Sequence, residues 1–289
     1  MALYTGNNKV CITKQNRVPV TGIEREVSSQ GVIQLPTHNF SFTLPSNATN
    51  LDSYALAYAF YNPDSYEPSY ITSADFSSLK HIDGDHALDS SFYACANLTS
   101  VDFSSLETID GQYALYRAFY YCTSLTSVSF SSLVSITGNK ALSDAFVHAE
   151  NLETASFPNL TTIGSNVTTS NCAQFAEAFQ IGGWDSTFTS LSFPELTTIY
   201  CTGTAGTSNG TFYSLGSSIK KIYFPKLTTI TYGTGASSTY QGAYKNIFYG
   251  TSLTEIHFGA ANQAAIEANP GYSTLWGRGA GNATVYFDL

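Results

Sequence analysis

The sequence repeats one short phrase along most of its length. Residues 98–106 read LTSVDFSSL, and residues 125–133 read LTSVSFSSL, a near copy 27 residues further on. The phenylalanine of each phrase gives the register of the repeat. The anchor positions, with a leucine standing in at the first, are Leu44, Phe76, Phe103, Phe130, Phe157, Phe193, Phe224, Phe258 and Phe287. Successive anchors lie 27 to 36 residues apart, a period that indicates a solenoid of stacked units.

The apolar residues of each unit predict a strand around the anchor. Val101 lies two residues before Phe103, so that apolar and polar side chains alternate as they do in a half-buried strand. Leu106 and Ile109 follow at intervals of three residues, and most of the other units repeat these positions. A single unit cannot cover its own apolar face, so we expect stacked units to bury continuous columns of Phe, Leu and Ile.

The segment that follows the isoleucine predicts a short helix. In ALYRAFYYC the small and apolar residues lie at positions i, i+1, i+4, i+5 and i+8, which form one face of a helix. These residues are Ala114, Leu115, Ala118, Phe119 and Cys122.

The repeats resemble a known family. LTSVSFSSLVSITGNKALSDAFVHAENL and the later FPNLTTI, FPELTTI and FPKLTTI are similar to the BspA-like leucine-rich repeats of bacterial surface proteins. The likeness covers residues 40–258, and NATVYFDL fits a last strand. The resemblance implies an α/β, right-handed leucine-rich-repeat solenoid with a parallel concave sheet and short helices or irregular turns on the convex side. It implies adhesion or recognition at a surface and no catalytic residue set, because the family shares only a scaffold.

The repeat register divides the chain after residue 36. We expect residues 1–36 to form an N-terminal cap or attachment segment, in which NKVCITK, RVPV and GVIQL are short strands. The first turn of a solenoid needs such a cover, and a separate docking module is the alternative. Residues 37–289 are expected to form the solenoid, with about nine turns, which we call rungs.

The charge of the chain argues against nucleic acid as a partner. Charged residues make up 11% of the sequence, the net charge is −9, and only 12 lysines and arginines are present. Phosphate binding needs clustered basic residues. No run of about 18 apolar residues occurs, so we expect no membrane insertion. We expect an extracellular, cell-surface or virion location, and the lack of a visible signal peptide in this chain favours the virion.

The sequence shows no catalytic or cofactor-binding pattern. The cysteines are odd in number and scattered without a CxxC pair, which predicts free thiols at Cys11, Cys95, Cys122, Cys172 and Cys201. The most metal-like stretch, DGDHALD, lacks the spacing of a calcium loop, so we expect a solvated turn. His257 is expected to be an ordinary exposed side chain beside its strand anchor. We therefore expect no enzyme, no metal and no cofactor.

Three long connections are the candidate binding loops. From the isoleucine to the phenylalanine of the predicted helix, the regular units use ten residues, but later units use 16 (163–179), 13 (199–212) and 18 (230–248). Their content of Tyr, Gly, Ser and Asn is typical of binding loops, and we expect all three on one rim. The candidate ligand-binding residues are Tyr200, Tyr232, Tyr240, Tyr244 and, in a separate insertion, Trp184. The outward strand residues are small in the first units, which predicts a poor binding surface there.

We therefore expect a non-enzymatic recognition or adhesion protein of a bacterial surface or a phage tail. Its partner is expected to be a host or cell-surface protein or glycan, bound through the rim loops. The alternative is a structural spacer without its own ligand site, in which the long connections are tolerated surface variation. The sequence leaves the oligomeric state open.

Overall fold

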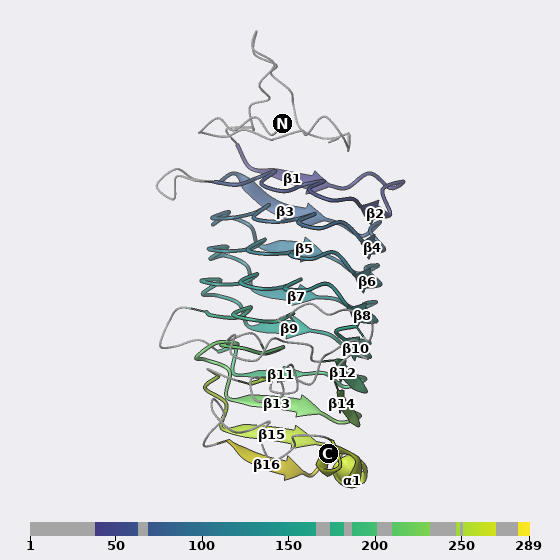
Figure 1. Cartoon of the computed structure of the whole chain (residues 1–289). Coiled ribbons are helices and arrows are strands. Elements are labelled where there is room, and N and C mark those ends of the chain that lie inside the picture. Colours follow the sequence, from purple (N-terminus) through teal and green to yellow (C-terminus); the bar gives the residue numbers. More distant parts are fainter. Residues whose placement is uncertain are drawn as a thin grey trace.

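The anchor phrase of each repeat folds as a short strand, and Figure 1 shows these strands one above another along the molecule. The computed structural model describes residues 38–62, 69–165, 174–181, 187–200, 210–231, 247–248, 251–269 and 283–289. The expected cap, residues 1–36, lies outside this part of the chain.

The anchor strands form one side of the solenoid, which we call the strand face. They are β1 (Phe40–Thr43), β3 (Ile71–Asp75), β5 (Ser100–Asp102), β7 (Ser127–Ser129), β9 (Thr154–Ser156), β11 (Ser190–Ser192), β13 (Lys221–Phe224), β15 (Glu255–Phe258) and β16 (Thr284–Phe287). They pair in parallel in two sheets, β1–β3–β5–β7–β9 and β11–β13–β15–β16. In β5, β7, β9 and β11 the middle residue is buried between two exposed neighbours, which confirms the predicted alternation.

A second row of strands follows the anchors. It consists of β2 (Asn50–Leu51), β4 (His81–Ile82), β6 (Thr108–Ile109), β8 (Ser135–Ile136), β10 (Thr162–Ile163), β12 (Thr198–Tyr200) and β14 (Thr229–Thr231). These strands form one seven-stranded parallel sheet, in which Ile109, Ile136 and Ile163 lie opposite one another and are fully buried. Strands of two or three residues are too short to produce an alternating pattern, so the sequence did not predict this sheet.

The segment predicted as a helix is a ribbon of turns. Its buried residues between positions 114 and 122 recur every four residues, whereas a helix repeats every 3.6. Every fourth residue has a left-handed backbone: Tyr113 (φ 53°), Arg117 (φ 52°) and Tyr121 (φ 59°). The next rung repeats this at Lys140, Asp144 and His148. A helix cannot contain a left-handed residue in every turn, so the helix prediction is wrong.

The ribbon is held by two alternating kinds of backbone hydrogen bond. The amides of Leu115 and Phe119 donate to the next rung, to the carbonyl oxygens of Ala141 (2.7 Å) and Ala145 (2.9 Å). The even-numbered residues of this stretch, such as Ala118, donate their amides within the rung to the third residue back, here Leu115 (3.1 Å). A left-handed residue other than glycine costs about 1 kcal/mol. The bonds between rungs offset that cost. We call the side made by residues 52–62, 84–95, 111–122, 138–149, 174–181 and 210–216 the turn face.

Two columns of stacked phenylalanines fill the core between these sides. In the anchor column, the ring centroid of Phe130 lies 5.3 Å from that of Phe103 and 5.1 Å from that of Phe157. The anchors from Leu44 to Phe258 are at most 2% exposed and Phe287 is partly buried, which confirms the predicted register. The second column lies under the turn face and consists of Phe60, Phe92, Phe119, Phe146 and Phe179, with centroids 5.0 to 5.5 Å apart.

A short helical segment follows β15. It consists of η3 (Ala260–Asn262) and α1 (Gln263–Glu267), which is the one α-helix in the described part of the chain. The side chain of Ile266 is buried, and Nδ2 of the Asn269 side chain donates to the carbonyl oxygen of Thr228 (3.0 Å). The helix is thereby fixed against the second strand row. No helix among the described residues is long and apolar enough to cross a bilayer.

Two of the cysteines lie in the described part of the chain, and both are buried free thiols. Cys95 and Cys122 occupy the same position in adjacent rungs, and their thiols donate to the carbonyl oxygens of Phe60 (3.2 Å) and Phe92 (3.1 Å). Burial raises the pKa of Cys95 to about 12 and raises that of Cys122 well above its ordinary value. The thiols Cys11, Cys172 and Cys201 lie outside the described residues.

We expect all five cysteines to be reduced. In the native protein at neutral pH, iodoacetamide should leave Cys95 and Cys122 unlabelled, because a buried thiol with a raised pKa is neither accessible nor ionised. Denaturation without reductant should then expose every thiol to alkylation, which intact mass counts. A shortfall of two labels after denaturation would reveal a disulfide and contradict the prediction.

Candidate functional site

The strand face carries small polar side chains over β1 to β11. Their hydroxyl groups bind one another between rungs: Ser73 Oγ donates to Ser41 Oγ (2.6 Å), and Ser156 Oγ donates to Ser129 Oγ (3.0 Å). Binding energy at interfaces comes mainly from Tyr, Trp and Arg anchors, which the outward positions of these strands lack. The outward side chains are small and polar as expected, and poor binding by this surface stays a prediction.

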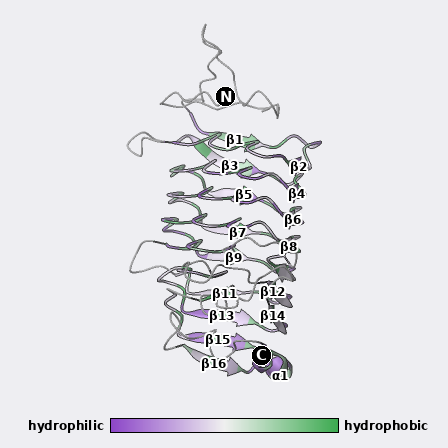
Figure 2. Ribbon diagram, viewed as in Figure 1, coloured by the Kyte–Doolittle hydropathy of each residue, from purple (hydrophilic) through white to green (hydrophobic). Residues whose placement is uncertain are grey.

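The strand face becomes charged at its C-terminal end. Figure 2 colours β13 and β15 largely hydrophilic, and the ammonium of Lys221 lies 2.9 Å from a carboxylate oxygen of Glu255 across these two strands. The hydrogen bond from Lys221 lowers the pKa of Glu255, and the same bond raises the pKa of Lys221. Because both side chains are open to water, the pair is worth little in stability.

His257 on β15 is buried instead of exposed, so the expectation for this residue is wrong. Its ring is stacked between Tyr223 and Tyr286 from the neighbouring strands, with both centroids 4.7 Å away, and only 8% of the residue is exposed. Its ring nitrogens lie 3.0 Å from Glu255 Oε2 and 2.9 Å from Asp288 Oδ1. These contacts lock the last strands together, so we assign His257 a structural role.

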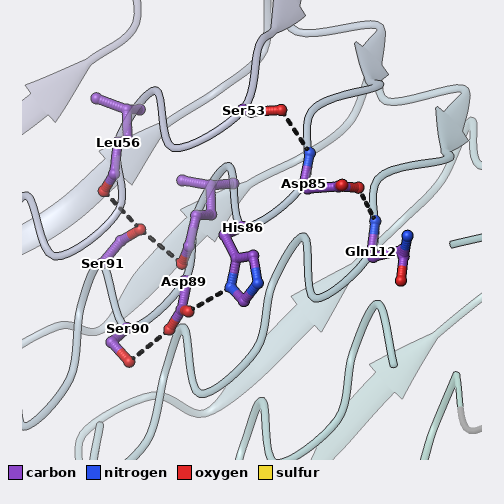
Figure 3. Close-up of polar contacts among 9 residues, drawn as sticks. Ser53, Leu56, Asp85, His86, Asp89, Ser90, Ser91 and Gln112 are labelled. Atoms are coloured by element: carbon purple, nitrogen blue, oxygen red, sulfur yellow. Dashed lines mark hydrogen bonds and ion pairs between the residues drawn. The ribbon is translucent and has the colours of Figure 1, made fainter. Parts of the chain in front are cut away.

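Two carboxylates of the DGDHALD stretch, those of Asp85 and Asp89, bind separate protein partners, as Figure 3 shows. Asp85 accepts the backbone N–H of Gln112 (2.7 Å). Asp89 binds the ring of His86 (2.7 Å) and accepts the hydroxyl of Ser90 (2.8 Å). Across the part of the chain that the structure describes, no group of three or more His, Cys, Asp or Glu residues could hold a metal ion.

Aromatic side chains cover the turn face in the first rungs. Tyr54, His86 and Tyr113 stack in parallel, with centroids 5.0 and 4.9 Å apart. A second column lies near the end of each ribbon and consists of Tyr61, Tyr93 and Tyr120, with centroids 4.9 and 5.0 Å apart. Each ring covers the face of the next, so the columns present ring edges to solvent and stabilise the stack. These stacked columns were not predicted, because the segment was interpreted as a helix.

Arg117 gathers charged and aromatic groups on the same face. Its Nε lies 3.3 Å from Asp144 Oδ2, and its guanidinium lies over the rings of Tyr116 (4.8 Å) and Tyr120 (5.8 Å). Burial and the neighbouring Asp144 carboxylate raise the pKa of Tyr116 to about 12, and the same two causes raise the pKa of Glu177. Because Arg117 is already bound to Asp144 and stacked, this cluster holds rungs together.

The long connections begin and end at matching positions of consecutive rungs. They leave β10, β12 and β14 after paired residues, since Ile163, Ile199 and Ile230 lie opposite one another. They return at Phe175, Phe212 and Phe248, whose rings stack with centroids 5.5 Å apart at each step. All three connections therefore start and finish on one edge of the solenoid, between the second strand row and the turn face. We call this edge the rim.

The stacking corrects the lengths assigned to the connections. Phe175 takes the place that Leu142 has in the rung before, Phe212 stacks on Phe175, and Phe248 stacks on Phe212. The sequence register had matched Phe212 and Phe248 to Phe179 instead. Leu142 lies six residues after Ile136 in a regular rung. The corresponding intervals are 12 residues (163–175), 13 residues (199–212) and 18 residues (230–248). The middle and last connections therefore exceed a regular rung by 7 and 12 residues, where the sequence register indicated 3 and 8.

Tyr200 is the one candidate binding residue that the structure describes. It ends β12, pairs with Thr231 of β14 and is half-buried at the base of the rim. Its carbonyl oxygen lies so close to Gly164 that a Cβ there would approach to 2.2 Å. The other candidates, Tyr232, Tyr240, Tyr244 and Trp184, lie outside the described residues.

A polar hollow of about 340 Å³ opens at the other end of the turn ribbons. Gly216 borders it, in the position that a phenylalanine holds in the five preceding rungs. A Cβ at Gly216 would lie 2.0 Å from the carbonyl oxygen of Phe179, and φ is 151°, so only glycine fits. The other lining residues are His148, Gln180, Ile181, Ser214, Ser217 and Ser252. We call this hollow the serine groove.

Comparison with protein families matches the chain to the BspA type leucine rich repeat region, in six copies over residues 37–175 and 118–241. Solved structures similar to the chain include the leucine-rich repeat protein of T. pallidum, with 17% identity, a TM-score of 0.32 and coverage of 82% of this chain and 98% of that one. Another is a leucine-rich repeat protein from Bacteroides ovatus, with 13% identity, a TM-score of 0.31 and coverage of 82% and 70%. A search of curated proteins finds no match.

Proposed function

The chain belongs to the BspA-type leucine-rich repeat family, and from that premise we propose that it is a recognition domain that binds a protein or glycan through its rim. Members of this family are typically surface-associated repeat proteins without enzymatic activity, and the fold suits protein interaction or adhesion. We place the domain on a bacterial surface or on a phage tail, where such a rigid stack would carry a binding edge toward a partner.

The alignment of the three long connections on one rim supports this proposal. Paired strands fix where the connections begin, and stacked phenylalanines fix where they end. Loops carried by a rigid scaffold are the usual location of binding residues. Tyrosine adds a rigid amphipathic contact, and the sequence places Tyr232, Tyr240 and Tyr244 in the longest connection.

The test of this proposal removes two rim tyrosines together. Tyr232→Ala with Tyr240→Ala should weaken attachment to the target about tenfold or more, because truncation of aromatic anchors removes most of the energy of an interface. The measurement is binding of the purified domain to intact bacterial cells and to protein and glycan arrays. The melting temperature should hardly change, because exposed side chains contribute little to the core.

A matched variant on the other side of the solenoid is the control. Ser127→Ala with Ser129→Ala removes two hydroxyls from β7 and should leave attachment unchanged. Sensitivity of the strand face combined with an indifferent rim would show that the wrong surface has been chosen. Normal attachment without the rim tyrosines and without the strand hydroxyls would favour a spacer that carries no ligand site of its own.

A further inference from the structure

We infer that the serine groove is a second binding site, for one sugar unit of a neutral glycan. The inference rests on the proposed function in one respect: the glycan would be carried by the same cell or partner surface that the rim recognises. The groove lies at the end of the turn ribbons, and the rim lies at their beginning, so the two sites use different residues.

The size and construction of the groove fit a small ligand. A volume of about 340 Å³ lies at the lower end of small-molecule sites, which run from about 300 to 1,000 Å³. Four successive rungs contribute lining residues, from His148 in one to Ser252 in another. The rungs are tied by backbone bonds such as that from His148 N–H to the carbonyl oxygen of Gln180 (3.1 Å). The walls are thus fixed before any ligand binds, which lowers the cost of binding.

The lining chemistry fits hydroxyl groups. The side chains of Ser214, Ser217 and Ser252 each carry a hydroxyl that both donates and accepts, and Gln180 adds an amide with both roles. A sugar hydroxyl has the same dual character, so several of them can be paired at once. Gln180 is already oriented, since its Nε2 lies 3.4 Å from the carbonyl oxygen of Ser214.

The groove also provides apolar surface for a ring. Ile181 forms part of the wall but is only 2% exposed, so the ring surface comes mainly from the partly exposed His148. The imidazole of His148 lies parallel to the ring of Tyr121 at 4.4 Å, so the ring in the wall is held from behind. Tyr121 itself is 39% exposed beside it. Small-molecule sites commonly combine such apolar walls with a few placed polar groups.

The described lining residues carry no fixed charge, which favours a neutral ligand. None of the described lining residues is a lysine, arginine, aspartate or glutamate. The ammonium of Lys220 is already bound, since it donates to the carbonyl oxygen of Ser217 (2.7 Å). Among these described lining residues, a phosphate or carboxylate would find no fixed opposite charge, and neither would a cation.

The backbone around the groove disfavours a peptide ligand. Extended peptides bind by adding a strand to an open sheet edge. Here the amides of Glu177 and Phe179 donate to the next rung, to the carbonyl oxygens of Tyr213 (2.8 Å) and Leu215 (3.0 Å), and that of Gln180 donates within its own rung. These groups are used by the solenoid itself.

The experiment measures binding of galactose, mannose, N-acetylglucosamine and their β-linked disaccharides to the whole chain by ligand-observed NMR and calorimetry. We expect at least one of these sugars to bind, and we expect Gln180→Ala with Ser214→Ala to weaken it about tenfold or more, through loss of two hydrogen-bonding side chains. Ser217→Trp blocks the groove from an exposed position without removing a buried contact, and it should abolish binding. A thermal melt confirms that each variant is folded.

The controls separate this inference from the proposed function. Tyr232→Ala with Tyr240→Ala should leave sugar binding unchanged, and so should Ser127→Ala with Ser129→Ala. If no sugar binds, or if binding survives in the folded groove variants, the inference is wrong even where the rim still mediates attachment. Preference for an anionic sugar or for a peptide would overturn it as well. Sugar binding without any attachment to cells would instead contradict the proposed function.

Discussion

Phe130→Ala should lower the free energy of unfolding by about 3–5 kcal/mol, because it opens a cavity in the middle of the anchor column. The side chain is fully buried and stacked between Phe103 (5.3 Å) and Phe157 (5.1 Å). Each rung contacts only its two neighbours, so both interfaces of this rung lose packing. Urea unfolding followed by far-UV circular dichroism measures the change.

Two further variants are the controls for Phe130→Ala. Val134→Ala shortens an apolar side chain of the same repeat that is 45% exposed, and it should change the free energy of unfolding by less than about 0.5 kcal/mol. Phe287→Ala lies in the last rung, where the ring is only partly buried and, among the described residues, stacks on Phe258, so it should cost less than Phe130→Ala. An unfolding curve of Phe130→Ala that coincides with that of the unchanged protein would refute the anchor register.

The anchor register could be predicted because one large residue marks each rung. Phenylalanine recurs beside a period-two alternation, and that combination has few other structural solutions. The cap and the number of rungs stay predictions, since residues 1–36 lie outside the described part. The second strand row gave no signal of its own because its strands are two or three residues long.

The turn ribbon could not be predicted from residue preferences. Over nine residues a period of four and a period of 3.6 place the same side chains inward, and Ala, Leu and Arg favour helices. Left-handed backbone at Tyr113 and Arg117 is unfavourable in isolation. The reason for it is a row of bonds to the adjacent rung, which only the stacked structure supplies.

Of the two candidate sites, the sequence could predict the rim but not the serine groove. The rim was predictable, since extra residues at one point of a repeat must leave the stack at one edge. The serine groove was not, because it depends on the true register of Phe212 and on Gly216 taking a phenylalanine position. Side chains that line it are also far apart in the sequence, from His148 to Ser252, and no motif connects them.

The corner where the second strand row turns into the ribbon is set by glycine. In the regular rungs Gly84, Gly111 and Gly138 lie one above another, and each leaves room for the backbone of its neighbour. In the following rung the corner contains Gly164, with a left-handed backbone (φ 81°), and the first long connection follows directly. The rim thus begins at the rung in which Gly164 replaces the regular, closely stacked glycine corner.

Gly111→Ala should therefore be among the most destabilising single substitutions in the solenoid. A Cβ on Gly111 would lie 2.0 Å from the carbonyl oxygen of Gly84, and the three nearest atoms are all backbone of Gly84 and Asp85, so no flexible side chain can move away. The amide of Gly111 is also fixed by its bond to the carbonyl oxygen of Ile82 (3.0 Å). We expect a loss of about 3 kcal/mol or more, at or beyond the upper end of overpacking costs, measured by urea unfolding.

A substitution at the adjacent residue, Gln112, is the control: it shows whether any substitution at this corner destabilises the protein or only one that closes the contact between rungs. Gln112 is exposed, and Gln112→Ala keeps the backbone amide that Asp85 accepts, so the free energy of unfolding should change by less than about 0.5 kcal/mol. If Gly111→Ala were as harmless as Gln112→Ala, the rungs could not be in contact at the glycine corner. The spacing between them would then have to be set by the phenylalanine columns alone.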